Sequence, residues 1–571
     1  MGKYNLLDES WIPVLRNDTG AVENVSLLTF FEHAQEYRAL AGEMETQNFA
    51  VLRVLLAVLI TVFTRVDQDG EPYEWLELDD TNGKKLIVEE PVDEMDADDY
   101  LDALDETWKA VWNEHRFPAI VTEYLEAWRD RFYLLDNTYP FFQVTKKELI
   151  DRLPSGKGAS AVNAKSFTGK QMNRLISESN NKEALFAPVV NKQKSRMTAT
   201  ELIRWLITMQ GYVGTADKVK FPVDSKVTNS KGWLYDIGGI YMAGDDLFET
   251  LWINTLLHHP ADERYSLSPQ TPCWEDPPAK RLEMILKGNI QTNLASLYTA
   301  WGRAIYIPTE WTEEQEVSIG AVKVPEINHE NNFLEPMTLW SLNKTGEHKN
   351  KFMPRTHRPE QSLWRSFGLL IPDKNNVEAK RPIIIDYYHE IKSFLNNRMV
   401  ELHAVSMLSD GNATSWMPID EVTDTLSLHE IIVTDIDGDG WGVRVRNTIE
   451  DTKAIIEQIY QPFLGKTAKI RGIDRSDFVG SQISELYGTI DMPFRDWLCS
   501  ICPEDDKDSK VRIWKLELRH IILDAASSIM AHLSARDYLT RDKEKKNKEN
   551  IIVAYKIFKY ELNKKIPPEI R

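Results

Sequence analysis

The last part of the chain carries apolar residues at the spacing of one face of an α-helix. After about residue 425, four consecutive segments repeat apolar positions every three or four residues, the period of an amphipathic helix. They run from Ile449 to Phe463, Phe478 to Leu498, Ile513 to Leu533 and Ile551 to Leu562. Successive amphipathic helices bury their apolar faces against one another. We therefore expect a four-helix bundle over residues 426–571.

The pattern before residue 425 is mixed. Helical spacing is found over 30–64, 103–130, 199–210 and 245–258, and residues 4–15 alternate as a short strand. Short apolar runs separated by Pro, Asn and Gly indicate β-rich structure between about 265 and 425. These runs are Ala304–Ile307, Thr338–Leu342, Leu369–Ile371, Pro382–Ile385 and Val400–Met407. Residues 153–170 are small, polar and basic without a consistent period, which predicts a loop. The predicted fold class is α+β, with a large mixed α/β domain over residues 1–425 followed by the bundle.

The most apolar run, Ala50 to Phe63, is a candidate core helix. It is about fourteen residues long and contains Arg53, whereas a membrane-spanning helix needs about 20 apolar residues. The first residues lack the apolar core of a signal peptide. Three cysteines are too few for a disulfide scaffold and fit a reducing compartment. We expect a cytoplasmic protein that does not contact a membrane.

The net charge is distributed unevenly over the 571 residues. A formal charge of −20 argues against a nucleic-acid partner, because phosphates are neutralised by cations. However, residues 1–150 hold 13 Lys+Arg and 31 Asp+Glu, including an acidic stretch over 66–105 that we interpret as a surface insertion. Residues 151–240 hold 14 basic and 7 acidic side chains, and residues 501–571 hold 16 and 12. The later part is therefore open to a polyanionic partner; the alternative is a solvated acidic surface with scattered basic faces.

Tests for catalytic and metal-binding motifs are negative. Gly465-Lys466-Thr467 resembles the end of a phosphate-binding loop, but Tyr460 stands where the first glycine is required. Asp435, Asp437 and Asp439 begin like a calcium loop whose twelfth position, Arg446, is a cation. The adjacent His258 and His259 diverge on a helix. Cys499 and Cys502 form a single pair, and we expect both thiols to be packed beside their apolar neighbours Trp497, Leu498 and Ile501. We expect no catalytic residue, no cofactor and no metal site.

Four stretches occur in an order that is typical of one family. They are Asn5-Leu6-Leu7-Asp8-Glu9-Ser10-Trp11-Ile12-Pro13-Val14; Phe132-Tyr133-Leu134 with Tyr139-Pro140-Phe141-Phe142-Gln143; Ser179-Asn180-Asn181-Lys182-Glu183-Ala184-Leu185-Phe186; and Met209-Gln210-Gly211-Tyr212-Val213-Gly214-Thr215-Ala216-Asp217-Lys218. Their order and spacing, the chain length and the closing helices resemble the CasA family, the large subunit of the type I-E CRISPR Cascade surveillance complex. The resemblance covers nearly the whole chain.

The resemblance implies a non-enzymatic DNA-recognition subunit with a mixed α/β domain and a four-helix bundle. Such a subunit binds double-stranded DNA, reads the short protospacer-adjacent motif, starts strand separation and helps to recruit the helicase-nuclease. The implied partners are the target duplex, the 5′ handle of the guide RNA, and the backbone and small subunits of Cascade. Some family members have a zinc-binding cysteine cluster, which this chain lacks.

The resemblance also assigns candidate binding residues. A loop beside RNA and DNA carries Ser179, Asn180, Asn181, Lys182 and Phe186. A glycine loop that approaches the minor groove carries Gly214, Thr215, Ala216 and Lys218, of which the first three are small enough for a close backbone approach. A wedge turn carries Gly411, Asn412 and Ala413; Asn412 is one methylene shorter than the Gln common in the family. Lys323 is the candidate minor-groove lysine.

Basic residues flank the first of these loops. Lys157, Lys165, Lys170 and Arg174 precede it, and Lys192, Lys194 and Arg196 follow it, interleaved with Asn, Ser and Thr. This composition is expected for contacts to a nucleic-acid backbone. Two alternatives stay open: a protein–protein scaffold whose basic loops are incidental, and a metal-dependent nuclease that uses the His258–His259 and Asp435–Asp439 clusters.

Overall fold

The computed structural model divides the chain into two compact units. The first contains Met1–His357, Val377–Phe394 and Leu402–Asp424, and the second contains Arg358–Asn376, Leu395–Glu401 and Thr425–Arg571. The residues that the structure describes are 4–154, 156, 158–178, 187–190, 193–214, 219–223, 231–372, 377–395, 398–411, 418–538 and 550–568. Nothing in the sequence pattern indicated that residues 358–376 and 395–401 belong with the second unit.

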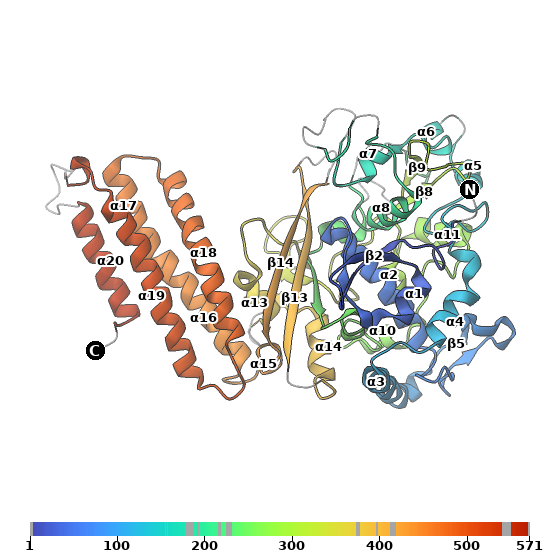
Figure 1. Ribbon diagram of the computed structural model, residues 1–571, viewed down its shortest axis with the longest axis horizontal. Coiled ribbons are helices and arrows are strands. Elements are labelled where there is room, and N and C mark those ends of the chain that lie inside the picture. The colour runs from blue at the N-terminus through green and yellow to red at the C-terminus, as the bar shows by residue number, and fades with distance from the viewer. Residues whose placement is uncertain are drawn as a thin grey trace. The chain divides into compact units, whose positions relative to one another are not determined.

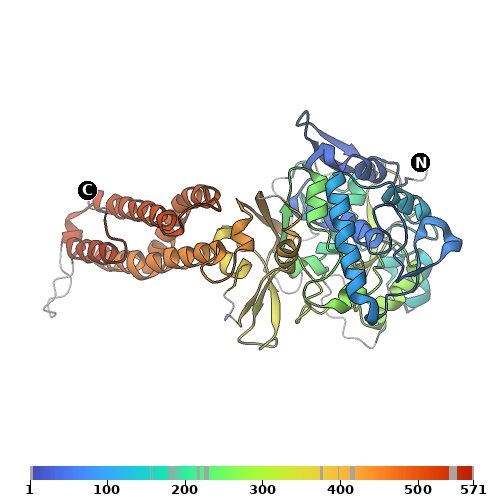
Figure 2. The same ribbon diagram turned by 90° about the horizontal axis from the view of Figure 1, so that it is seen from below.

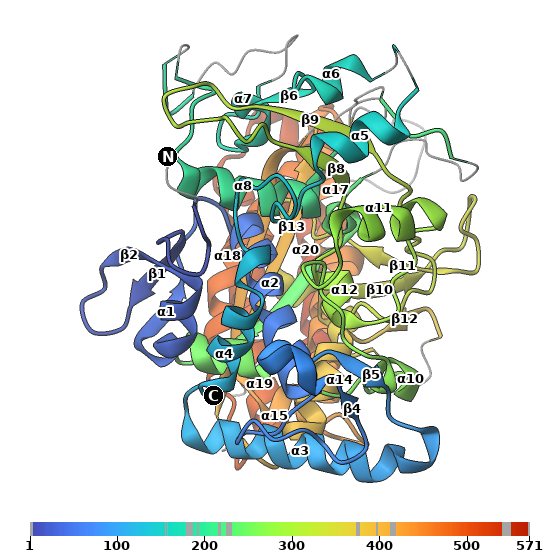
Figure 3. The same ribbon diagram turned by 90° about the vertical axis from the view of Figure 1, so that its right-hand side faces the viewer.

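The core of the first unit is built around α2 (Glu45–Phe63), in which every residue after Glu45 is buried. A helix that is apolar on all sides must be enclosed by other elements, and α2 packs against α4 (Ile120–Ala127), α8 (Ala199–Tyr212) and α12 (Leu294–Tyr298) (Figure 3). Its length and hydropathy would suffice to cross a membrane, but the whole apolar window is buried inside the protein. The expected core helix is therefore present and begins five residues earlier than predicted.

The charged residue inside α2 is neutralised by a partner far along the chain. Arg53 Nη1 and Nη2 donate to the two carboxylate oxygens of Glu335 at 2.8 and 2.7 Å, and both side chains are fully buried. The Arg53 guanidinium also lies 4.1 Å from the ring centre of Tyr298. A bidentate pair satisfies both charges in an interior where either alone would be strongly disfavoured.

The strands of the described residues form small antiparallel sheets. The spatial orders are β2-β1-β3, β11-β10-β12, β14-β13-β7, β6-β9-β8 and the pair β4-β5. The strands are β1 (Ile12–Arg16), β2 (Val22–Val25), β3 (Tyr37–Leu40), β4 (Glu77–Leu78), β5 (Val88–Glu90), β6 (Phe167–Thr168), β7 (Gly239–Ala243), β8 (Arg303–Tyr306), β9 (Ser318–Lys323), β10 (Leu339–Leu342), β11 (Phe352–Arg355), β12 (Ala379–Lys380), β13 (Met399–Ser409) and β14 (Pro418–His429).

Further helices and 3₁₀ turns lie between and around these elements. They are α1 (Leu27–Glu32), α3 (Ala97–Glu114), α5 (Lys146–Arg152), α6 (Ala159–Val162), α7 (Gly169–Met172), α9 (Leu247–Ile253), α10 (Glu263–Leu267), α11 (Pro278–Lys287), α13 (Phe367–Leu370), α14 (Ile383–Ile391) and α15 (Ile431–Thr434), with 3₁₀ turns η1 (Ala34–Glu36), η2 (Asp80–Lys85), η3 (Glu94–Asp96), η4 (Arg129–Arg131), η5 (Trp233–Asp236), η6 (Leu363–Ser366) and η8 (Ala535–Tyr538).

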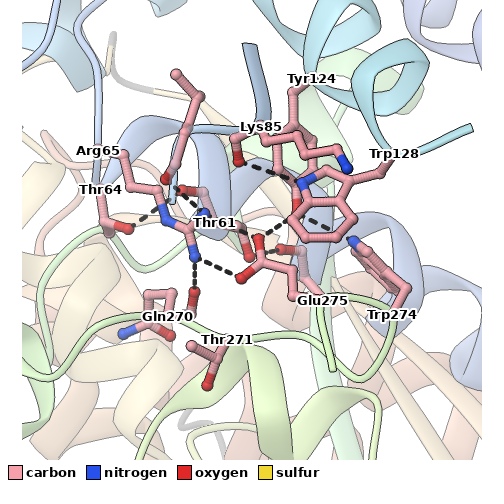
Figure 4. Close-up of polar contacts among 12 residues, drawn as sticks. Thr61, Thr64, Arg65, Lys85, Tyr124, Trp128, Gln270, Thr271, Trp274 and Glu275 are labelled. Carbon is pink, nitrogen blue, oxygen red and sulfur yellow. Dashed lines mark hydrogen bonds and ion pairs between the residues drawn. The ribbon is translucent and has the colours of Figure 1, made fainter. Parts of the chain in front are cut away.

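The acidic stretch 66–105 is anchored to the core through Arg65, the residue before it (Figure 4). Arg65 Nη1 donates to the Leu86 carbonyl at 2.9 Å and to Glu275 Oε1 at 2.8 Å. The Tyr124 hydroxyl donates to the same carboxylate at 2.7 Å, and the Trp128 indole N–H donates to the Lys85 carbonyl at 3.2 Å. This stretch, interpreted from sequence as a surface insertion, is therefore held at its base by a buried hydrogen-bond network.

The second unit contains the expected four-helix bundle (Figures 1 and 2). Within the described residues its helices are a continuous rod formed by α16 (Trp441–Ile455), the π-turn η7 (Ile456–Tyr460) and α17 (Gln461–Arg471), followed by α18 (Arg475–Cys499), α19 (Lys507–Ala531) and α20 (Ile551–Lys565). The π-turn ends at Tyr460, two residues before Pro462, which cannot donate a backbone hydrogen bond. Phe463 stacks on Phe558 at 5.1 Å between ring centres, and the Trp514 indole N–H donates to Thr452 at 3.0 Å.

Four local predictions were wrong. The helical region 30–64 is interrupted by β3. The run Pro382–Ile385 begins α14 rather than a strand: buried Ile384, Tyr388 and Ile391 continue at helical spacing beyond the four residues considered. Residues 153–170, predicted as a loop, contain α6 and β6 and lead into α7. The run Leu369–Ile371 likewise lies at the end of α13.

Candidate nucleic-acid interface

The glycine loop leaves the end of α8 at a point fixed by backbone contacts. The Gly232 N–H donates to the Val213 carbonyl at 2.9 Å, and Gly214 is buried. A Cβ at Gly232 would lie 2.1 Å from the Gly211 carbonyl oxygen, and a Cβ at Gly302 would lie 2.4 Å from the Gln210 carbonyl oxygen. Only glycine permits these approaches. Thr215, Ala216 and Lys218 lie outside the described residues.

Lys323, the candidate minor-groove lysine, lies beside the exit of the same loop. Its backbone N–H donates to the Val219 carbonyl at 3.0 Å, and Lys323 forms a parallel bridge with Lys220. Lys323 closes β9 with 8% of its surface exposed, whereas Lys220 is exposed. The structure therefore brings Lys323 and the glycine loop together, and Lys220 is the more accessible cation of the two.

The wedge turn falls between β13 and β14 in the chain, and these two strands are neighbours in one sheet. Gly411 has φ +70°, a backbone conformation that favours glycine, and nothing lies within 4 Å of the position of its missing Cβ. Asn412 and Ala413 lie outside the described residues. Ser409, the last residue of β13, hydrogen-bonds the side chain of Tyr235. On the other strand, the Ser177 hydroxyl donates to the carbonyl of Pro418, the first residue of β14.

The Glu178 carboxylate accepts hydrogen bonds from residues on both sides of the predicted RNA/DNA loop. Ser179, Asn180, Asn181, Lys182 and Phe186 lie outside the described residues, but Glu178 immediately before them is buried. Glu178 accepts from Lys170 Nζ at 2.8 Å and from Lys194 Nζ at 2.5 Å. Lys194 follows the loop, so this carboxylate joins the chain before and after it. Two of the basic residues that flank the loop are thus neutralised within the protein.

The described flanks of the glycine loop and of the wedge turn meet around η5. Gly232 precedes η5 and pairs with Val213 at the start of the glycine loop, while Tyr235 within η5 hydrogen-bonds Ser409 at the end of β13. The Trp233 indole N–H donates to Glu335, and its ring stacks on His329 with 4.2 Å between ring centres. Lys231 Nζ pairs with Asp236 at 2.9 Å. Through the Trp233–Glu335 hydrogen bond, the buried pair Arg53–Glu335 anchors η5 to the core of the first unit.

Burial changes the protonation behaviour of two groups at this junction. It raises the pKa of Tyr235 to about 12 and lowers the pKa of Arg174 to about 10, because each charged form loses hydration. Arg174 and Tyr235 interact electrostatically. Sequence reasoning missed Tyr235, Glu178 and Asp236. Ser409, the partner of Tyr235, lies far along the chain, whereas Glu178 and Asp236 pair with ordinary lysines, and no local spacing marks any of the three.

The residues considered as catalytic or metal-binding candidates make contacts that stabilise the fold. His258 lies 3.2 Å from Asp105, whereas the buried His259 hydrogen-bonds the Leu334 carbonyl, so the two rings serve different neighbours. Gly465 lies inside α17. Cys499 is half-buried and Cys502 is exposed, which contradicts the expectation that both thiols are packed. Over the part of the chain that the structure describes, no group of three or more His, Cys, Asp or Glu side chains is placed to hold a metal ion.

The fold defines a class of two-part proteins in which a large mixed α/β unit precedes a four-helix bundle. Comparison with known proteins identifies the family. The model of the CRISPR-associated protein Cse1 family matches residues 5–525, and the chain belongs to this family. A curated relative, CasA/Cse1 of Thermus thermophilus, is 24% identical over 377 residues, which are 65% of this chain and 60% of the relative. The chain thus spans less than two thirds of that relative in this match.

Solved structures share the fold over the full length. Cse1 of Thermobifida fusca has a TM-score of 0.75 and 23% identity, covering 99% of this chain and 98% of that chain. Cse1 of Acidimicrobium ferrooxidans has a TM-score of 0.70 and 19% identity, with complete coverage of both chains. A chain from a structure described as a CRISPR RNA-guided surveillance complex has a TM-score of 0.65 and 13% identity, covering 98% and 99%.

Proposed function

We propose that this protein is the non-catalytic large subunit of an RNA-guided type I-E CRISPR (Cascade) complex in the cytoplasm. It would recognise the protospacer-adjacent motif in double-stranded DNA, start strand separation and help to recruit the helicase-nuclease. Membership of the Cse1 family and the likeness to a chain of an RNA-guided surveillance complex support this proposal. The observation that carries it is the convergence on η5 of the flanks of the glycine loop and of the wedge turn.

Each loop has a separate task in this proposal. The guide RNA supplies most of the sequence specificity through base pairing, and the protein reads a short duplex segment. The backbone at Gly214 approaches the minor groove, in which A·T and G·C pairs differ by the guanine amino group. The wedge turn at Gly411 carries Asn412 to the first base pair as a polar wedge. The loop 179–186 contacts the 5′ handle of the guide.

The shared contacts at η5 make the tasks of the glycine loop and the wedge turn dependent on one another. Val213 and Ser409 both hydrogen-bond to the segment 231–236. The same short turn therefore positions the start of the glycine loop and the end of β13. A groove-reading element and a wedge must stay in register, because strand separation has to begin beside the motif that is read. Lys220, exposed next to the loop exit, supplies phosphate neutralisation.

The test is a gel-shift assay of the assembled complex at fixed salt. We expect Asn412→Ala combined with Gly214→Asp to remove motif-dependent binding of the target duplex without unfolding the chain. Gly480→Asp is the matched control, because nothing lies within 4 Å of a Cβ at Gly480 on α18. Unchanged motif-dependent affinity of the double variant would contradict the proposal.

The alternatives give different results in the same experiments. A scaffold subunit would join the complex normally, but the wild-type complex would bind targets regardless of the adjacent sequence. A nuclease would cleave DNA as the purified chain with magnesium or manganese. Either result would replace the proposed function.

A further inference from the structure

A surface pocket of about 340 Å³ lies between α5 and the end of β8, which lie close together in the first unit (Figures 1 and 3). Its buried floor is formed by Pro140, Val144, Tyr306 and Ile307, and its rim is polar. The pocket lies in the lower part of the size range of small-ligand sites, about 300–1,000 Å³. The proposed function gives no task to this pocket or to the stretch 139–143 beside it.

Hydrogen bonds fix the walls of the pocket. The Val144 N–H donates to the Ile305 carbonyl at 2.8 Å, and the Ile307 N–H donates to the Gln143 side-chain carbonyl at 3.1 Å. The amide of the buried Gln143 in turn donates to the Leu134 carbonyl at 2.7 Å. The pocket is therefore preformed, and a ligand would not have to order these segments when it binds.

Two cations line the pocket without a counter-charge. Lys146 and Lys147 are exposed, and neither ammonium group pairs with a carboxylate among the residues that the structure describes. They are the first two residues of α5, where the partial positive charge of a helix start disfavours cations. Glu148, the acidic residue of this turn, is held by Thr145 in a capping box. The two lysines therefore stand against the local preference and are available to an anion.

The segment after β8 contributes hydrogen-bond acceptors to the same pocket. Glu310 is exposed and has no ion-pair partner within the described ranges. Beside it, the Thr309 hydroxyl donates to the Asn137 side-chain carbonyl at 3.2 Å. A ligand that is only an anion would gain from the lysines but would be repelled by Glu310. The pocket therefore suits a ligand with an anionic end, hydroxyl groups that donate to a carboxylate, and a flat apolar part that lies on the floor.

We propose that this pocket binds a ribonucleotide. Lys146 and Lys147 hold the phosphate, Glu310 accepts hydrogen bonds from the ribose hydroxyls, and the base lies on the apolar floor. Lysine neutralises phosphate as a point charge, and a carboxylate that accepts from ribose hydroxyls recurs in nucleotide-binding folds. The ligand is either a free ribonucleotide or an unpaired nucleotide of an RNA strand, which present the same groups. This inference goes beyond the proposed function and does not depend on it.

The experiment titrates the purified full-length chain with AMP and follows binding by saturation-transfer difference NMR. Three further probes each lack one of the recognised groups: adenosine lacks the phosphate, 2′-deoxy-AMP lacks a ribose hydroxyl, and ribose 5-phosphate lacks the base. We expect each to bind about 10-fold or more weakly than AMP, because loss of a hydrogen bond to a charged group, or of the apolar contact of the base, costs at least that factor.

Substitutions at exposed positions assign these groups to residues. Lys146→Gln combined with Lys147→Gln should weaken AMP binding about 10-fold or more and leave the affinity for adenosine unchanged. Glu310→Gln should narrow the difference between AMP and 2′-deoxy-AMP. Lys564→Gln is the matched control, because it removes the charge of an exposed lysine on α20 in the second unit and should leave AMP binding unchanged. Circular dichroism should show the native fold for every variant.

A further arm identifies the source of the ribonucleotide. Penta-adenylate RNA that binds at least as tightly as AMP, and loses affinity in the double lysine variant, indicates an RNA strand. Weaker binding of penta-adenylate than of AMP indicates a free nucleotide.

Several outcomes would overturn the assignment. They are the absence of saturable AMP binding up to about 1 mM, AMP binding that the double lysine variant leaves unchanged, and equal affinities of wild type for AMP and 2′-deoxy-AMP or for AMP and ribose 5-phosphate. Tighter binding of the tripeptide Asp-Leu-Lys, which carries an anion and a cation on either side of an apolar side chain, would assign the pocket to a protein partner instead.

Discussion

The Glu178 carboxylate accepts a hydrogen bond from Lys194 Nζ at 2.5 Å across sixteen residues of chain. Both side chains are buried, with 6% and 8% of their surfaces exposed. The residues between them include the predicted RNA/DNA loop, whose start and end are thereby held together. Lys170 approaches the same carboxylate at 2.8 Å from the preceding helix. The loop thus begins and ends at a defined place on the first unit.

Glu178→Gln should lower the free energy of unfolding of the first unit by about 3 kcal/mol, because it leaves the buried Lys194 without a counter-charge. Urea denaturation followed by circular dichroism measures this change. Glu126→Gln, which breaks an ion pair whose side chains are 35% and 43% exposed, is the control and should have a much smaller effect. Equal effects of the two substitutions would show that Glu178 does not hold the loop base.

Gly232→Ala should destabilise the protein by about 1–3 kcal/mol, since the new Cβ would overlap the Gly211 carbonyl oxygen and the backbone would have to move. Thermal unfolding measures the loss. Gly480→Ala adds the same methyl group to a helix where space is open, and it should be neutral or stabilising by up to about 1 kcal/mol. If Gly232→Ala unfolds at the wild-type temperature, the backbone approach is less close than described.

Glu335→Gln should lower the unfolding free energy by roughly 3–5 kcal/mol, because Arg53 would remain buried and uncompensated. The same carboxylate accepts from the Trp233 indole N–H, so the substitution should also alter tryptophan fluorescence of the folded protein. Guanidinium denaturation gives the first quantity and an emission spectrum gives the second. A variant with wild-type stability would mean that Arg53 finds another acceptor.

His259 should make the protein less stable as the pH falls from 6.5 to about 4. Burial lowers the pKa of His259 to about 4, so the unfolded chain binds the proton first and acid favours unfolding. Its ring is consistent with the neutral form, because the Ala261 N–H donates to Nδ1 and the Leu334 carbonyl accepts from Nε2.

Between pH 6.5 and about 4, protonation of His259 in the unfolded chain lowers the free energy of unfolding by about 3 kcal/mol. His259→Asn should therefore show a flatter dependence of unfolding free energy on pH than wild type, as determined by urea denaturation at each pH. His520→Asn, which changes an exposed side chain, should keep the wild-type slope. Parallel curves for wild type and His259→Asn would refute a buried neutral histidine.

Lys220→Gln should weaken target binding by the complex about equally for all adjacent sequences and should reduce the salt slope by about 0.9, because a phosphate contact carries no base information. Filter binding at several salt concentrations measures both effects. Lys287→Gln is the control, since Lys287 is exposed on α11 and pairs with Glu283. A change in motif preference on Lys220→Gln would instead make Lys220 a base-reading residue.

The parts of the fold that depend on local spacing were predictable from the sequence. The bundle helices follow from apolar positions within each segment, and α8 follows from a capping box, Thr198 with Glu201, ahead of an apolar run. The short apolar run Pro382–Ile385 predicts a strand, whereas the helical spacing of α14 is visible only over a longer window.

The candidate site was predictable only in part. The resemblance to the CasA family indicated the loops, whereas nothing local indicates that Ser177 bonds Pro418, 241 residues away, or that Tyr235 contacts Ser409. The basic residues around the loop at 179–186 suggested contacts to a nucleic-acid backbone. The structure instead neutralises Lys170 and Lys194 with Glu178 and leaves Arg174 uncompensated, a distinction that depends on side-chain pairing in three dimensions.

The contacts that hold the glycine loop are made by backbone atoms, at Gly232 against Gly211 and at Gly302 against Gln210. A carbonyl oxygen is the same in every residue, so most substitutions around these glycines leave the contact surface unchanged. The side chains nearby can therefore diverge widely while the loop stays in place, provided that the glycines remain. Substitution of the glycines themselves, by contrast, would displace the loop, because any Cβ there would overlap a carbonyl oxygen.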